Sequence, residues 1–189
     1  MNKILIAINP RWCREILAGR KTIEVRKTRP NCRQPIKCYI YCTLSGSNEL
    51  FREVLSRDIA KWNKEGWADK KGNVIGECTI RAIDRVCRVG YMGQYDTQSE
   101  YMIVGHLAPQ QITADMYRAM ALSKSEIAKY FGGKEGYLWH ISDVKEYAKP
   151  IPVSSFIRLR ETKFGLELNE IERPPQSWFY VTEGGKINE

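Results

Sequence analysis

The sequence predicts an α+β protein in which a small, curled or barrel-like β-sheet has helices packed against its rim. Segments with the alternation or apolar content of strands outnumber segments with helical periodicity. Irregular connections separate them, so the repeated strand–helix–strand order of a parallel sheet is missing. The 189 residues suffice for a substantial core. We expect a single domain over 1–189, with a core over about 1–147 and a C-terminal extension over about 148–189 packing on it.

The first two elements are a strand and a short helix. Residues 4–8 are apolar and predict a strand. Asn9 is a favourable helix N-cap, and Pro10 suits the first helical position because its fixed φ is already helical. Gly19 is expected to end the helix, since glycine adopts positive φ without a steric penalty.

The second strand is expected over residues 21–27 and is crowded with charge. Ile23 and Val25 should lie on one face and Thr22, Glu24 and Arg26 on the other, because side chains alternate along a strand. Lys21 sits at the preceding turn, from which a flexible side chain can reach the charged face. A cation beside a carboxylate can bind a polar ring, or supply a lysine of lowered pKa as base or nucleophile. The alternative is a surface ion-pair cluster with a structural role.

The remaining elements follow from local patterns. A capping box, Ser123 with Glu126, predicts the start of one helix, which should end before Gly132. Residues 90–112 show no persuasive period and are expected to be irregular. Further strands are expected at 36–43, 73–89, 136–147 and 177–181, and further helices at 49–63 and 123–131.

Charge is distributed unevenly along the chain. Residues 1–43 hold ten Lys and Arg against two acidic residues, whereas the rest of the chain holds 20 of each. The net charge of +8 therefore comes from the first quarter of the chain. Such asymmetry favours a polyanionic partner, which in the cytoplasm usually means nucleic acid. The alternative is a solvated basic face without a partner.

Several classes of function find no support in the sequence. The six cysteines and two histidines form no CxxC pair or Cys/His cluster, so we expect no metal site and reduced cysteines. No phosphate-binding glycine loop or nucleophile elbow is present, so no cofactor is expected. The chain has no apolar run of membrane-spanning length and no signal peptide, so we expect a cytoplasmic protein without a membrane contact. Nothing indicates an obligate protein partner.

The charged strand resembles a known signature. Gly19-x-Lys21-x-x-Glu24-x-Arg26 is similar to the GxKxxExR motif of the ASCH family, which has small PUA-like β-barrel domains. The segments 36–43 and GYLWHI at 136–141 occur in the order that the family shows. The closing RPPQSW at 173–178 resembles the tail of ASCH proteins of phages and Gram-positive bacteria. The resemblance implies a cleft between the first helix and the motif strand that binds RNA or a modified nucleobase.

One branch of the family implies an enzyme. The bacterial N4-acetylcytidine amidohydrolases resemble this chain through GRKT, residues 19–22, and their proposed machinery is a Lys, a Thr and a more distant Glu. Lys21 matches the Lys, but Glu24 occupies the position of the catalytic Thr. The chain therefore departs from that mechanism, although a glutamate can act as a general base on water. Glu77 and Glu100 are candidates for the third residue.

Other residues extend the candidate site. Arg11 and Arg20 are candidate phosphate contacts, and Trp12 on the first helix could stack on a base or belong to the core. Trp139 could likewise supply a stacking face or pack against neighbouring strands. With Gly19, Lys21, Glu24 and Arg26, these residues form the predicted binding set.

Three functions follow. The first is binding of RNA, or of a modified nucleoside within it, in the basic cleft. The second is an amidohydrolase acting on N4-acetylcytidine or a related N-acylated nucleoside, with Lys21 and Glu24 catalytic. The third is a metal-independent ribonuclease in which Lys21 and Arg26 stabilise the pentavalent phosphate. Whether the chain is an enzyme stays open at this stage.

Overall fold

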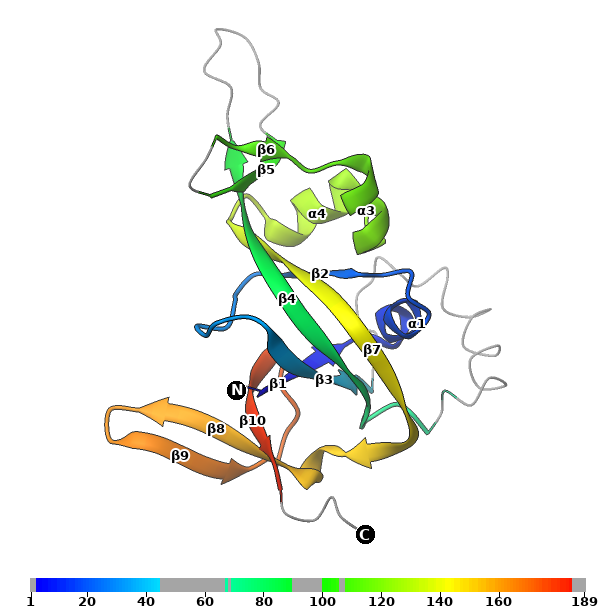
Figure 1. Ribbon diagram of the computed structural model, residues 1–189, viewed down its shortest axis with the longest axis vertical. Coiled ribbons are helices and arrows are strands. Elements are labelled where there is room, and N and C mark those ends of the chain that lie inside the picture. The colour runs from blue at the N-terminus through cyan, green and yellow to red at the C-terminus, as the bar shows by residue number, and fades with distance from the viewer. Residues whose placement is uncertain (1–2, 45–66, 68, 90–99, 106–107, 185–189) are drawn as a thin grey trace, which may run out of the picture. The chain divides into compact units, whose positions relative to one another are not determined.

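The computed structural model describes residues 3–44, 67, 69–89, 100–105 and 108–184. The helices are α1 (Pro10–Leu17), α3 (Ala114–Met120), α4 (Lys124–Phe131) and a 3-10 turn, η2 (Val153–Ser155) (Figure 1). The strands are β1 (Lys3–Ile8), β2 (Ile23–Arg26), β3 (Ile36–Cys42), β4 (Asn73–Val89), β5 (Glu100–Val104), β6 (Gln110–Gln111), β7 (Gly136–Pro152), β8 (Phe156–Thr162), β9 (Gly165–Glu170) and β10 (Trp178–Glu183). The helix expected at 49–63 lies outside the described residues.

The α+β class is confirmed, but the expected closure into a barrel is wrong. The strands of the described residues follow the open order β2-β7-β4-β3-β1-β10-β8-β9, with β5 paired to β4 and β6 to β5. Strands β2 and β9 end this path and do not pair with each other. A closed barrel needs a hydrogen-bonded partner on both edges of every strand.

The chain forms two compact units, which we call unit 1 and unit 2. Unit 1 comprises residues 1–17, 36–79 and 143–189. Unit 2 comprises residues 18–35 and 80–142. Each unit has its own hydrophobic core, and strands β4 and β7 contribute residues to both.

Unit 1 is built around strand β1. β1 pairs in parallel with β3 and antiparallel with β10, and β10 continues to the β8–β9 hairpin. β1 lies between these two strands, and its residues from Ile4 onward are buried. The expected caps of α1 are confirmed: Asn9 accepts a hydrogen bond from the backbone of Arg11 at 3.0 Å, and Gly19 has φ +71°. The β8–β9 hairpin was not predicted from the sequence, and its second strand is exposed throughout.

Unit 2 packs helices on one face of its strands. Its core joins side chains of β2, β4 and β7 with those of α3 and α4, including Ile23, Val86, Leu138 and Phe131. The capping box of Ser123 is confirmed. The irregular course expected over 90–112 is wrong where the structure describes it, because β5 pairs with β4 and β6 pairs with β5. Helix α3 was also missed; Thr113 caps it without the acidic residue that marks a capping box.

Two tyrosine–glutamate pairs connect strands of unit 1. The Tyr39 hydroxyl donates to Glu183, which also accepts from Lys3 Nζ at 2.7 Å. The Tyr147 hydroxyl donates to Glu77 at 2.7 Å, and Lys37 Nζ lies 2.9 Å from the same oxygen. Hydrogen bonds from Lys3 and Tyr39 lower the pKa of Glu183. Partial burial would raise the pKa of Glu77, but the bonds from Tyr147 and Lys37 outweigh it and lower this pKa.

These pKa shifts predict a loss of stability in acid. A carboxyl with a lower pKa in the folded than in the unfolded state stabilises the fold above its ordinary pKa of 4.5. We therefore expect the melting temperature to fall as the pH drops below about 4.5, and Glu183→Gln to flatten this dependence. Melting curves between about pH 7 and pH 3 test this, with Glu167→Gln on exposed β9 as the control. Parallel curves for wild type and Glu183→Gln would contradict the prediction.

Among the described residues, every helix is too short or too polar to cross a bilayer.

Candidate functional site

The candidate site is built on the pairing of β2 with β7 in unit 2. The strands run antiparallel, with Glu24 opposite Trp139 and Arg26 opposite Tyr137. On the other face, Val25 lies opposite Leu138, and Ile23 lies opposite His140. Ile23, Val25 and Leu138 belong to the core of the unit. The predicted alternation of β2 is therefore confirmed for its charged and apolar faces.

Lys21, Glu24 and Arg26 form one buried ion cluster. Lys21 Nζ lies 3.2 Å from Glu24 Oε2, and Arg26 Nη2 lies 3.0 Å from Glu24 Oε1. The three residues are only 2%, 6% and 8% exposed, respectively. The expected surface location of this alternative is therefore wrong, whereas its structural role stays a prediction. Charges are costly to bury, so the arrangement depends on each group keeping its partners.

Lys21 is held by backbone carbonyls of helix α3 and strand β2. Its ammonium donates to the backbone carbonyls of Ile23 at 2.9 Å and Met120 at 2.7 Å. Met120 is the last residue of α3, where the helix dipole favours a cation. The backbone of Thr22 also donates to Ala119 O at 2.9 Å. Burial lowers the pKa of Lys21, and the charge of Glu24 opposes this shift.

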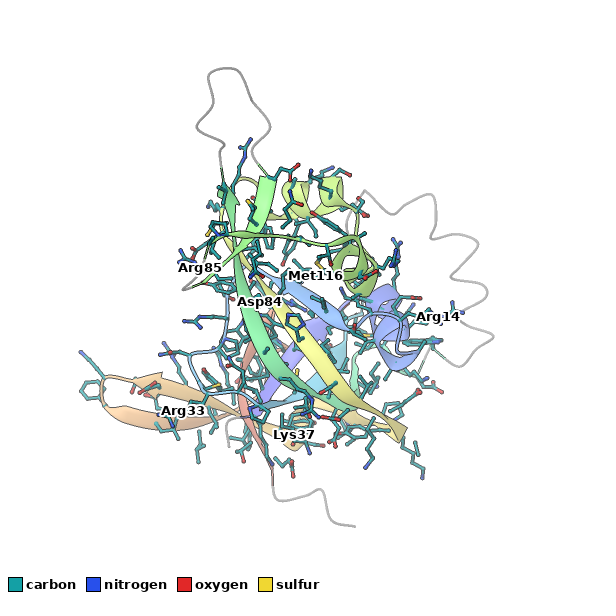
Figure 2. The ribbon with its side chains drawn as sticks, turned by 45° about the horizontal axis from the view of Figure 1, so that its top comes forward. Arg14, Arg33, Lys37, Asp84, Arg85 and Met116 are labelled. Atoms are coloured by element: carbon teal, nitrogen blue, oxygen red, sulfur yellow. The ribbon has the colours of Figure 1, made fainter. Side chains whose placement is uncertain are left out.

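A second group of side chains lies around Tyr137 on the charged face of β7. The Tyr137 hydroxyl donates to Glu135 at 3.2 Å, and Arg85 Nη2 donates to Glu135 at 2.5 Å. The Arg29 guanidinium lies 5.9 Å from the centre of the Tyr137 ring. Figure 2 labels Arg85 beside Asp84 on β4. Asp84 instead meets His140, at 2.8 Å.

Unit 2 also holds most of the excess positive charge. Residues 18–35 and 80–142 contain 13 Lys and Arg and seven Asp and Glu, a net charge of +6 out of +8. Lys27, Arg29 and Arg33 follow β2 directly and are exposed. The ion cluster thus lies in a basic unit that attracts anions.

The structure brings together four of the predicted binding residues: Lys21, Glu24, Arg26 and Trp139. Gly19 and Arg20 precede them in an exposed turn of unit 2. Trp139 is fully buried, so in this structure its ring offers no open stacking face.

The other predicted residues lie elsewhere. Arg11 and Trp12 belong to α1 in unit 1, with the Arg11 guanidinium 4.6 Å from the Trp12 ring centre. Glu77 is held in unit 1 by Lys37 and Tyr147. Glu100 pairs with Lys124 on the surface of unit 2.

One aromatic residue near the cluster was not predicted from the sequence. Tyr130 in the last turn of α4 is 40% exposed, and Lys27 Nζ lies 5.0 Å from its ring centre. Helical periodicity could have found it, because Ile127 and Phe131 lie on the core face of α4 and leave Tyr130 at its border.

A solved structure resembles this arrangement of elements. The crystal structure of a serine-to-alanine variant of ZmASCH from Zymomonas mobilis matches with a TM-score of 0.53 and 18% identity, over 95% of this chain and 88% of that one. This chain has the ASCH fold. Structures of ZmASCH itself and of a tyrosine-to-phenylalanine variant give TM-scores of 0.48 at 18% and 16% identity. They cover 95% and 96% of this chain and 87% and 91% of theirs.

No family model and no curated protein matches the chain. The ASCH resemblance expected from the GxKxxExR signature is therefore confirmed as a distant structural similarity, without the expected closed barrel.

Proposed function

We propose that this ASCH-fold protein binds RNA, or a modified nucleoside within it, through the charged face of β2 in unit 2. The observation that supports the proposal most directly is the convergence of Lys21, Glu24 and Arg26 in one buried cluster. Lysine and arginine donate to phosphate and to base carbonyl groups, whereas a carboxylate accepts from a base amino group such as that of cytosine. Arg26 therefore supplies donors and Glu24 an acceptor, whereas Lys21 directs its ammonium to Ile23 O, Met120 O and Glu24 and holds the carboxylate in place.

The contacts among these three side chains favour specific recognition of a ligand over non-specific electrostatic binding. Glu24 is flanked by two cations and Lys21 by two carbonyls, so the polar atoms are held in defined directions before a ligand arrives. Preorganised polar groups lose little conformational freedom on binding. The net charge of +6 on unit 2 adds long-range attraction for a polyanion.

Several expectations from the sequence remain predictions beside this proposal, on cellular location, further contact residues and related proteins. The cytoplasmic location expected from the sequence stays a prediction. Arg11, Trp12, Gly19 and Arg20 stay predicted contacts, as does the cleft expected from the family resemblance. The kinship with ASCH proteins of phages and Gram-positive bacteria also stays a prediction.

A salt titration of RNA binding tests the proposal. We expect a labelled single-stranded RNA of about ten nucleotides to bind with a slope of about −0.7 in log K against log salt for each phosphate contacted. Glu24→Gln, shown by circular dichroism to be folded under the assay conditions, should weaken binding about tenfold, because it removes a charged hydrogen-bond acceptor while keeping the shape. Fluorescence anisotropy between about 50 and 300 mM salt measures both effects.

The matched control is Glu167→Gln, which removes the same charge from exposed strand β9 of unit 1. It should leave affinity within about twofold of wild type. Equal weakening by both variants, or no binding at the lowest salt, would count against the proposal. Equal binding of duplex DNA would remove its specificity for RNA.

A second candidate function has its own supporting observation. Burial lowers the pKa of Lys21, and Glu24 lies 3.2 Å from its Nζ, so the pair could act in acid–base chemistry. An amidohydrolase would add water to the acetyl carbonyl of N4-acetylcytidine and release cytidine and acetate. Chromatography of that incubation tests it, with Lys21→Met as the variant. Turnover by the wild type and not by the folded variant would favour the enzyme, and no turnover would exclude this substrate.

A further inference from the structure

Two exposed cations of unit 2 each lie over a tyrosine ring. Lys27 Nζ is 5.0 Å from the centre of Tyr130, and the Arg29 guanidinium is 5.9 Å from the centre of Tyr137. Lys27 and Arg29 are exposed, Tyr130 is 40% exposed and Tyr137 is half-buried. Unit 2 therefore exposes positive charge together with aromatic rings, which is the composition of sites that bind single-stranded nucleic acid.

Both rings lie next to the Lys21–Glu24–Arg26 cluster. Tyr137 is the cross-strand neighbour of Arg26, on the charged face of β7. Burial raises the pKa of Tyr130. The charge of Arg26 lowers this pKa and the charge of Glu24 raises it, so both charges reach the phenol. The ring of Tyr130 is held in place by Phe131, whose centre lies 5.4 Å away.

We propose that Tyr130 and Tyr137, together with Lys27 and Arg29, form a track for single-stranded RNA. On binding, Lys27 and Arg29 move from the rings to the phosphates, and bases stack on the two rings in their place. The inference rests on the proposed function: one nucleotide contacts Glu24 and Arg26, which are 6% and 8% exposed, and the track holds its neighbours. Duplex RNA does not fit this track, because its bases are already stacked and paired and present no free faces.

The track predicts that affinity depends on the length and strandedness of the RNA. Tyr130→Ala should weaken binding of a single strand of about ten nucleotides by about 10- to 100-fold, the loss typical of a stacking platform. The same variant should bind cytidine 5′-monophosphate as the wild type does. Tyr130→Phe keeps the ring and should retain affinity for the single strand within about twofold.

The chain offers a matched aromatic control. Phe164 in unit 1 is 86% exposed, and Lys163 Nζ lies 4.9 Å from its ring centre. Phe164→Ala thus removes an exposed ring beneath a lysine within unit 1, and it should leave RNA affinity unchanged. Circular dichroism melting of each variant shows whether it is folded, and anisotropy and calorimetry measure the two ligands.

The outcomes separate this inference from the proposed function. Unchanged single-strand affinity in Tyr130→Ala, with the wild type binding tightly, would overturn the track and leave the proposed function standing. Equal affinity of wild type for a duplex of the same length would also overturn the track. No wild-type binding of either the mononucleotide or the single strand would overturn the proposed function itself. Selective loss of single-strand affinity in Tyr130→Ala supports the track.

Discussion

Replacing Glu24 with alanine is expected to lower the free energy of unfolding by about 3–5 kcal/mol, because it leaves Lys21 and Arg26 buried without the carboxylate between them. Urea denaturation followed by circular dichroism measures the change. The effect should shrink at alkaline pH. Burial lowers the pKa of Lys21, and losing Glu24 lowers it further, so the cost of the buried ammonium disappears as the pH rises toward its ordinary pKa of 10.5.

Glu135→Ala is the matched control, since it breaks an Arg–Glu pair in the same unit whose side chains are 57% and 45% exposed. An exposed pair contributes little, so we expect a loss below about 1 kcal/mol. The double variant Lys21→Met/Glu24→Gln should recover part of the loss, because replacing a whole buried pair is often neutral. Equal losses of unfolding free energy in Glu24→Ala and Glu135→Ala would show that burial does not determine how much the cluster contributes to stability.

Replacing Gly136 with alanine is expected to destabilise the protein by about 3 kcal/mol, through overpacking of the core of unit 2. A Cβ at this position would overlap Cε1 and Cζ of Phe131 and lie 2.5 Å from its Cδ1. Phe131 is 1% exposed, and its ring centre lies 5.1 Å from that of Tyr101, so the ring has little room to move. Denaturant unfolding measures the loss.

A second substitution tests whether the Phe131 ring is the cause. Phe131→Leu shortens the side chain, so its combination with Gly136→Ala should cost less than the sum of the two changes. Gly105→Ala is the control, because a Cβ there has no heavy atom within 4 Å, and it should change stability by less than about 0.5 kcal/mol. Strict additivity of the Phe131 and Gly136 variants would contradict the clash.

Local signals in the sequence determined much of the fold. The N-cap at Asn9, the positive φ of Gly19 and the capping box at Ser123 involve residues only a few positions apart, so the sequence was enough to predict them. The same holds for the two faces of β2. The hairpin β8–β9 was missed because Gly165-Leu-Glu-Leu is weak in β-branched residues, and β8 owes its place to pairing with β10.

Only the tertiary structure decided that the Lys21–Glu24–Arg26 cluster is buried. Alternation predicts that Glu24 and Arg26 share a face, but it does not tell whether other segments cover that face. The carbonyl of Met120 that holds Lys21 lies 99 positions along the chain, beyond the reach of any local pattern. Burial depends on such distant contacts, and it changes how much the charges of these three residues affect the stability of the fold. On a surface their ion pairs would contribute little to the free energy of unfolding. In the interior each charge must be paired, and the pairing fixes the orientation of the side chains.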